Sequence, residues 1–182
     1  YHILGLSITR GGSTLGLTDF RGTLLREADV SSPGMGPDEA LARIDGAVRD
    51  FLGTPPPGRL LGMGMIAPGP LDARRGLLLN PPNFEGWRDV PLGDHFRAEL
   101  GAPALLENNA TALALAEKSC GMGHRHPRFL AVVVDTGIGG GFVTPDGIYK
   151  GSMGFGSEIG HTSIRFDGPL CTCGNRGCAE LY

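Results

Sequence analysis

One histidine and three cysteines stand close together near the end of the sequence. They are His161, Cys171, Cys173 and Cys178. Three cysteines and one histidine form a standard closed shell for structural zinc. Gly174 and Gly177 would let a short loop fold back so that the three sulfurs converge. The spacing predicts one structural zinc ion with four protein ligands, and the alternative is a chance group of thiols in a reduced protein.

Two carboxylates flank this set of ligands. Glu158 lies just before His161, and Glu180 lies just after Cys178. A zinc shell that already has four protein ligands does not need them. The segment therefore has the character of a site whose shape is set by a metal and whose ligand is another molecule.

The composition excludes several classes of protein. The 182 residues carry a net charge of −3 and no basic stripe of the kind that binds nucleic acid. No apolar run reaches the roughly 18 residues of a membrane span, and nothing indicates a secretion signal. Clustered cysteines without such a signal favour metal binding in a reducing compartment, so we expect a cytoplasmic protein without a membrane partner.

Hydrophobic periodicity predicts an α/β protein with a mixed sheet. Strands are expected at 2–8, 13–19, 23–30, 60–66, 76–79 and 104–107, and helices at 37–52, 92–100 and 109–120. A strand at 129–134, with a hairpin partner at 140–144, opens a second lobe. We place the first lobe at 1–123 and the start of the second at 124–182.

Two motifs resemble those of the ROK family (repressor, open reading frame, kinase). One is Glu158-Ile-Gly-His161 followed by Cys-x-Cys-Gly-x-x-Gly-Cys-x-Glu, and the other is the glycine loop at 135–141. The resemblance runs from Leu4 to Tyr182 and implies the two-lobe actin-like (ribonuclease H-like) fold. Family members continue beyond the zinc motif, so we expect the second lobe to be incomplete here. The family contains both sugar kinases and sugar-responsive transcriptional regulators.

The resemblance also implies a sugar site. The positions that correspond to sugar contacts are Asn83, Asn108, Asn109, Glu158, His161 and Glu180, with His161 also a zinc ligand. Carboxylates and amides suit a sugar because its hydroxyls both donate and accept hydrogen bonds. Helix capping is the alternative role for the Asn108–Asn109 pair, and it would explain one of the two.

Two departures from the family's kinases favour binding without catalysis. Asn109 stands where those kinases have the aspartate that takes the proton from the attacking sugar hydroxyl. A carboxamide is no general base, and losing one typically costs on the order of 10²–10⁴ in rate. Ser7 replaces the aspartate of the first hairpin, and Thr9 and Arg10 replace its glycine pair. ATP and magnesium are therefore not expected as ligands.

The glycine loop is retained, with Gly137, Gly139 and Gly140 as remnants of a phosphate loop. Its backbone N–H groups could cradle phosphate, or the glycines could serve a tight turn kept for packing. Because the other ATP-handling residues are missing, packing is the favoured interpretation.

Three functions remain open at this point. The favoured one is a sugar-binding effector domain of a ROK-type transcriptional regulator, which binds a sugar or amino sugar without phosphorylating it. DNA contact would come only from an N-terminal helix-turn-helix absent from this chain, and the full-length protein would form a dimer or tetramer. The alternative is an ATP-dependent hexose or N-acetylhexosamine kinase. A zinc-stabilised fragment without a ligand ranks last, because it leaves Glu158 and Glu180 without a role.

Overall fold

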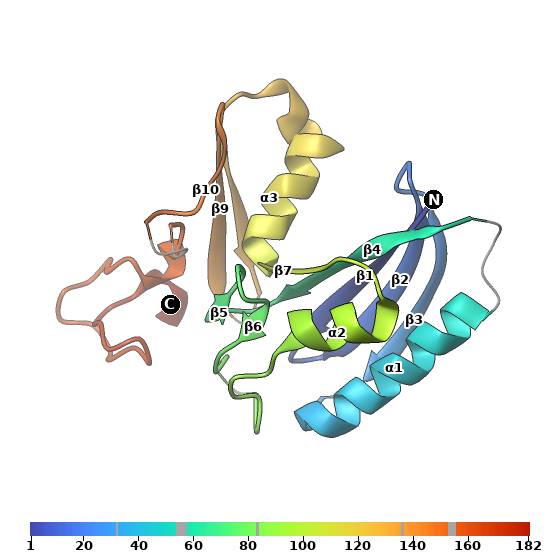
Figure 1. The fold of residues 1–182 in the computed structure, drawn as a ribbon. Helices are drawn as coiled ribbons and strands as arrows, with labels where there is room; N and C mark the ends of the chain where they lie inside the picture. The colour runs from blue at the N-terminus through green and yellow to red at the C-terminus, as the bar shows by residue number, and fades with distance from the viewer. Residues whose placement is uncertain (32, 54–57, 83, 136, 153–155) are drawn as a thin grey trace. The chain divides into compact units, whose positions relative to one another are not determined.

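The computed structural model describes residues 1–31, 33–53, 58–82, 84–135, 137–152 and 156–182. Asn83, one of the predicted sugar contacts, and residue 136 of the glycine loop lie outside the described residues. Packing divides the chain into two compact units, Tyr1–Asn108 and Asn109–Tyr182 (Figure 1). Within the described ranges, no helix has both the length and the apolar character needed to cross a membrane.

The first unit is built on a five-stranded mixed sheet in the order β3-β2-β1-β4-β7. Strands β1 (His2–Thr9), β2 (Gly12–Asp19) and β3 (Leu24–Ser31) form an antiparallel meander. Strand β4 (Leu60–Ala67) pairs parallel with β1, and β7 (Ala104–Asn108) pairs parallel with β4. This mixed order agrees with the sheet that the periodicity predicts.

Two helices cover one face of this sheet, α1 (Pro37–Gly53) and α2 (Leu92–Leu100) (Figure 1). Leu4 and Leu6 of β1 and Ile44 of α1 are at most 2% exposed, because alternate residues of the strand point to the same face. A small hairpin of β5 (Leu71–Asp72) and β6 (Leu77–Leu78) precedes α2. Only two residues of the strand expected at 76–79 are extended.

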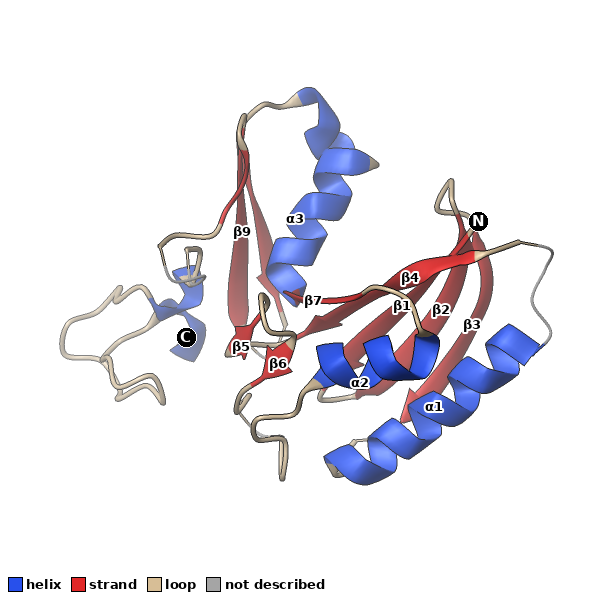
Figure 2. Ribbon diagram, in the orientation of Figure 1, coloured by secondary structure: helices blue, strands red, loops and turns tan. Residues whose placement is uncertain are grey.

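The second unit contains α3 (Asn109–Ser119) and a three-stranded antiparallel sheet in the order β10-β9-β8. The strands are β8 (Phe129–Val134), β9 (Ile138–Thr144) and β10 (Gly147–Tyr149). After β10 the chain is mostly loop (Figure 2), interrupted by the 3-10 turns η2 (Ile159–His161) and η3 (Ala179–Leu181). A further 3-10 turn, η1 (Met122–Arg125), follows α3. These turns are too short to produce a periodic pattern in the sequence.

Helix α3 belongs with the second unit because small residues bring it close to β9. A Cβ atom added to Gly141 would lie 2.4 Å from the carbonyl oxygen of Ala110 and 2.5 Å from Cβ of Ala114. One added to Gly139 would lie 3.0 Å from Cβ of Ala110. The packing units therefore divide at Asn108/Asn109, whereas the sequence pattern places the lobe boundary after residue 123, beyond this helix.

Candidate functional site

The four predicted metal ligands converge in the second unit. The ligand atoms of His161, Cys171, Cys173 and Cys178 all lie within 4.8 Å of one another. The Sγ atoms of Cys173 and Cys178 are 3.6 Å apart, and Cys171 Sγ lies 3.6 Å from His161 Nδ1. Zinc–ligand bonds of about 2.0–2.3 Å at a tetrahedral centre give edges of roughly 3.5–3.8 Å. The donor set fits a tetrahedral ion in its identity and number, and these two distances match such edges.

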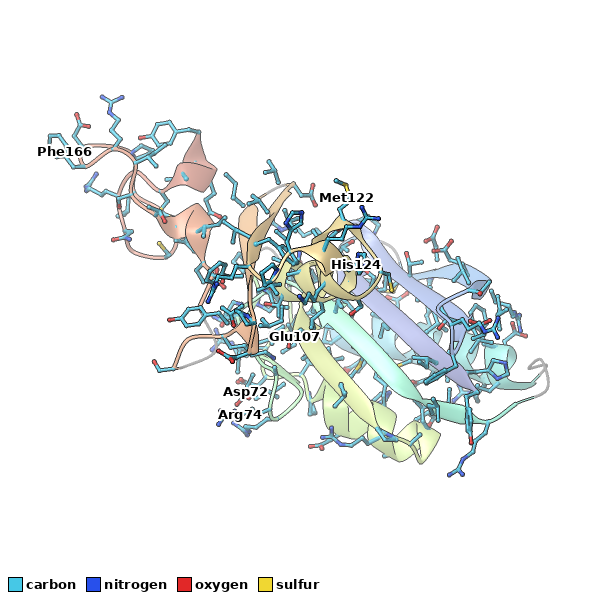
Figure 3. All side chains as sticks on the ribbon, turned by 90° about the horizontal axis from the view of Figure 1, so that it is seen from above. Asp72, Arg74, Glu107, Met122, His124 and Phe166 are labelled. Carbon is cyan, nitrogen blue, oxygen red and sulfur yellow. The ribbon has the colours of Figure 1, made fainter. Side chains whose placement is uncertain are left out.

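Tight turns bring these ligands together. The backbone N–H of Cys171 donates to the carbonyl of Asn175 at 2.7 Å, and Gly174 has a positive φ of 92°. Gly177, with φ 64°, passes so close to Arg165 that a Cβ would lie 1.7 Å from its carbonyl oxygen. Only glycine fits there. At the outer end of the loop, Phe166 is 90% exposed (Figure 3). This apolar side chain lies in solvent, whereas Cys171 and Cys178 are buried. The loop therefore packs around the cysteines rather than around Phe166.

The three thiols have different environments. Cys171 and Cys178 are buried, whereas Cys173 is exposed. Burial is the main cause that raises the pKa of the Cys178 thiol to about 12. A backbone hydrogen bond at Asn175 is the main cause that lowers the pKa of Cys173. Because a metal binds thiolate rather than thiol, an ion in this cluster would displace the proton of Cys178.

Glu180 is directly attached to the ligand cluster. Its Oε1 atom lies 3.2 Å from His161 Nδ1 and 3.4 Å from Cys171 Sγ. On its other side, a Cβ added to Gly137 would lie 3.3 Å from Oε2 of Glu180. The carboxylate therefore sits between the cluster and the residue that precedes β9, a position that motif spacing does not predict.

Glu158 comes from the turn on the other side of His161. It directly precedes η2, and its carbonyl accepts the backbone N–H of His161 at 3.1 Å. Its side chain is exposed. Next to it, the hydroxyl of Ser157 is buried and has no hydrogen-bond partner within the described part of the chain. Sequence reasoning missed Ser157, because a lone serine beside a loop carries no pattern.

The two asparagines lie on opposite sides of the division between the units. Asn108 ends β7, where its backbone N–H donates to Oε1 of Glu107 at 3.0 Å. Asn109 begins α3, and its Oδ1 accepts the backbone N–H of Ala110 at 2.8 Å. This contact with the next residue differs from a helix N-cap, in which the side chain accepts the N–H of the second or third helical residue. Asn109 shares the second unit with Glu158, His161 and Glu180.

Polar groups in the turn between β1 and β2 form hydrogen bonds with one another. The backbone N–H of Gly11 donates to Oγ1 of Thr9 at 3.2 Å, and that hydroxyl donates to the carbonyl of Gly12 at 2.9 Å. A polar cavity of about 300 Å³ adjoins the turn; it is lined by Thr9, Gly11, Gly12, Ser13, Thr14, Asp29, Ser31 and Pro33. The Asp29 carboxylate, which accepts a 3.0 Å hydrogen bond from Thr14, gives this cavity negative charge.

The glycines of β9 have packing neighbours on both sides. Besides the contacts of Gly139 and Gly141 with α3, a Cβ added to Gly140 would lie 2.8 Å from the carbonyl oxygen of Ser157 and 3.1 Å from the Ile159 side chain. Gly160 of η2 approaches β9 equally closely, since a Cβ there would lie 2.1 Å from the Ile138 carbonyl oxygen. These contacts give the glycine run a steric role that is independent of any phosphate.

Fold and ligand cluster together define the class of protein. The mixed sheet with its helices is the actin-like ATPase (ribonuclease H-like) fold, which solved sugar kinases share. More particularly, the chain belongs to the ROK family, whose model matches residues 4–182.

The chain is similar to proteins of both kinds within this family. It is 36% identical over 170 residues to the xylose repressor of Bacillus subtilis, covering 91% of this chain and 43% of that protein. It is 42% identical over 118 residues to the glucokinase of Thermotoga maritima, covering 65% of this chain and 37% of that protein. The chain thus spans less than half the length of either relative.

A solved structure gives the same picture of the fold. The structure of a ROK family transcriptional regulator, a homolog of the Escherichia coli MLC protein, superposes with a TM-score of 0.87 at 27% identity. The match covers 99% of this chain and 46% of that one. Repressors and kinases of the family share the fold, so the choice between the two activities depends on individual residues.

Proposed function

We propose that this chain is the sugar-binding effector domain of a ROK-type transcriptional regulator and that it holds a sugar or amino sugar without phosphorylating it. The observation that carries the proposal is Asn109. Phosphorylation of a sugar hydroxyl needs a group that accepts its proton, and a carboxamide does not accept it near neutral pH. The same carboxamide still forms hydrogen bonds, so binding is compatible with the loss of catalysis.

The β1–β2 turn supports the same conclusion, because it is poorly suited to binding the phosphates of ATP. A turn that binds phosphate presents free backbone N–H groups to it. Here the N–H of Gly11 is engaged by the hydroxyl of Thr9, and Ser7 stands in place of an aspartate. The carboxylate of Asp29 adjoins the turn and would repel a phosphate. Neither ATP nor magnesium is part of the proposed function.

The proposed sugar contacts within the second unit are Glu158, His161, Glu180 and Asn109. The carboxylates of Glu158 and Glu180 would accept hydrogen bonds from sugar hydroxyls, and a ring N–H of His161 would donate one. The carboxamides of Asn108 and Asn109 can do both, and Asn83 is a further candidate. Zinc, held by His161 and the three cysteines, would supply structural cross-linking only, since its shell is complete. Glu180 lies beside two of these ligands and on the turn that directly follows a third, Cys178, so the ion would fix the segment that carries a sugar-binding carboxylate.

The alternative is an ATP-dependent hexose or N-acetylhexosamine kinase. The similarity to a glucokinase at 42% identity favours it. It requires another group to replace the missing aspartate and another set of donors for the phosphates. Operator binding, through a helix-turn-helix outside this chain, and assembly into a dimer or tetramer belong to the regulator proposal.

Calorimetry on the purified protein with a panel of monosaccharides tests the proposal. The panel includes xylose and glucose, because the similar proteins are a xylose repressor and a glucokinase. It also includes N-acetylated amino sugars, because the proposal allows an amino sugar as the ligand. We expect saturable binding of at least one sugar with a Kd between about 1 μM and 1 mM. A coupled assay with ATP and the same sugar should give no turnover. Turnover in the range of about 1–100 s⁻¹ would establish the kinase instead.

A further inference from the structure

We propose that the metal-ligand cluster is a redox switch in which hydrogen peroxide joins Cys173 and Cys178 as a disulfide and so abolishes metal binding. The Sγ atoms of these residues are 3.6 Å apart, and a disulfide needs about 2.05 Å. The switch rests on the proposed metal site, and its effect on a sugar rests on the proposed function.

Accessibility selects Cys173 as the residue that reacts first. Among the three cluster thiols, Cys173 is exposed, whereas Cys171 is 3% and Cys178 0% exposed. Oxidation of cysteines follows exposure and thiolate character, and a metal ligand is a thiolate. Cys173 is thus the entry point for peroxide, and buried Cys178 lies beside it as the resolving thiol.

The reaction proceeds in two balanced steps. The Cys173 thiolate attacks one oxygen of hydrogen peroxide, the O–O bond breaks, and sulfenic acid and hydroxide form. The Cys178 thiolate then attacks the sulfenic sulfur, forms the S–S bond and displaces a second hydroxide. Two protons convert the hydroxides to water. The two thiolates lose two electrons, peroxide gains them, and the metal ion keeps its oxidation state.

Oxidation removes half of the ligand set. Cys171 and His161 remain, and two donors do not hold zinc as four do. The same residues contact Glu180, and Cys178 directly precedes the turn η3 that carries it. Loss of the ion therefore releases the turn that carries the carboxylate assigned to the sugar by the proposed function. Sugar affinity should fall with oxidation and recover when thiol reductant and zinc are restored.

Zinc release and disulfide mapping test the proposal without any sugar. The zinc-loaded protein is treated with hydrogen peroxide while a chromogenic chelator records free zinc. Trypsin cleaves after Arg165 and Arg176, so Cys173 falls in the peptide 166–176 and Cys178 in the peptide that begins at Gly177. We expect one zinc released per chain, together with these two peptides linked by a disulfide that fragmentation places on Cys173.

Exposed Cys120 provides a control in the same molecule. If Cys120 becomes oxidised while zinc stays bound, the reagent has reached exposed thiols and the proposal fails. It also fails if zinc is lost without the disulfide between the two peptides. Cys120→Ser should leave the rate of zinc release unchanged. A changed rate in this variant would show that Cys120 takes part in the reaction and would overturn the proposal.

Cys173→His isolates the reactive thiol, because histidine is also a zinc ligand but forms no disulfide. Release of zinc should be about tenfold slower or more in this variant. Equal rates of zinc release in this variant and in the unsubstituted protein would overturn the proposal. If the variant binds zinc poorly, the peptide map of the unsubstituted protein shows whether Cys173 and Cys178 form the disulfide. If reduced protein binds no sugar, the proposed function fails while the switch stands; if zinc leaves and sugar affinity is unchanged, the coupling through Glu180 fails.

Discussion

The carboxylate of Glu180 lies 3.2 Å from Nδ1 of His161, so a predicted sugar contact and a predicted metal ligand touch each other. Glu180 also accepts the thiol of Cys171 at 3.4 Å. A metal bound to Nδ1 of His161 and to the Cys171 thiolate would leave neither atom with a proton for Glu180. It would position the carboxylate through the turn η3, which directly follows the ligand Cys178. The metal and the sugar are therefore expected to be thermodynamically coupled, each binding better in the presence of the other.

Substitution of Glu180 tests its role in sugar binding. Glu180→Ala should weaken sugar binding by about 10- to 150-fold, since hydrogen bonds to a charged group contribute about 1.5–3 kcal/mol. Glu180→Gln keeps the shape and one acceptor and should lose less. Titration calorimetry measures both. Glu99→Ala, at a surface ion pair with Arg49 in the first unit, is the control and should bind sugar normally.

An unchanged affinity in Glu180→Ala would remove this residue from the sugar site. Metal content must be measured alongside, because Glu180 lies against two ligands of the cluster. A variant that retains one zinc per chain and loses the sugar separates direct contact from collapse of the loop.

Metal analysis tests the ligand cluster itself. Protein purified without chelator should contain one zinc per chain, because four zinc donors lie within 4.8 Å of one another. Cys178→Ser should lose most of the zinc and lower the melting temperature, since the binding energy of a structural metal is partly folding energy. Cys120→Ser should retain both. A well-folded, metal-free protein with reduced cysteines would contradict the assignment.

Much of the fold is readable from the sequence, because the core follows simple periodicity. The alternation along β1 and the apolar face of α1 place Leu4, Leu6 and Ile44 in the core without knowledge of the fold. The placement of α3 is less evident. Its alanines meet glycines of a strand some thirty residues away, a complementarity of small residues that produces no hydrophobic period.

The candidate site was predictable only in part, for a similar reason. Spacing is enough to propose four metal ligands, because cysteine and histidine have few other reasons to cluster. The contact of Glu180 with His161 depends on the two 3-10 turns η2 and η3, which leave no periodic signal. The hydrogen bond by which Thr9 occupies the N–H of Gly11 likewise depends on turn geometry.

The packing of the glycine run can be tested on stability alone. Gly141→Ala should destabilise the protein by about 1–3 kcal/mol, because its Cβ would overlap the Ala110 carbonyl and backbone must shift. Gly46→Ala is the matched control. Its Cβ would meet nothing within 4 Å inside α1, so it should be neutral or stabilising by up to about 1 kcal/mol. Denaturant unfolding compares the two, and equal stabilities would refute the packing role.

Substitution of Asn109 tests whether a single residue separates this chain from a kinase. Asn109→Asp restores a carboxylate at the position where the family's kinases have the general base. It should still not reach turnover of about 1 s⁻¹ with ATP and a sugar, the lower end of kinase rates. The β1–β2 turn would remain unsuited to phosphate, with Thr9 holding the N–H of Gly11 and Asp29 nearby.

A combined variant shows whether the missing base or the altered β1–β2 turn limits phosphoryl transfer. One variant combines Asn109→Asp, Ser7→Asp, Thr9→Gly and Arg10→Gly. It should be more active than Asn109→Asp alone, because the loss of the Thr9 hydroxyl frees the backbone N–H donors of the turn. A coupled assay measures turnover, and circular dichroism confirms that each variant is folded. Kinase-level turnover in Asn109→Asp alone would mean that the turn binds ATP as it stands. In that case the missing base would be the sole obstacle to catalysis, and the chain would be a kinase that lacks its general base rather than a binding domain altered at both sites.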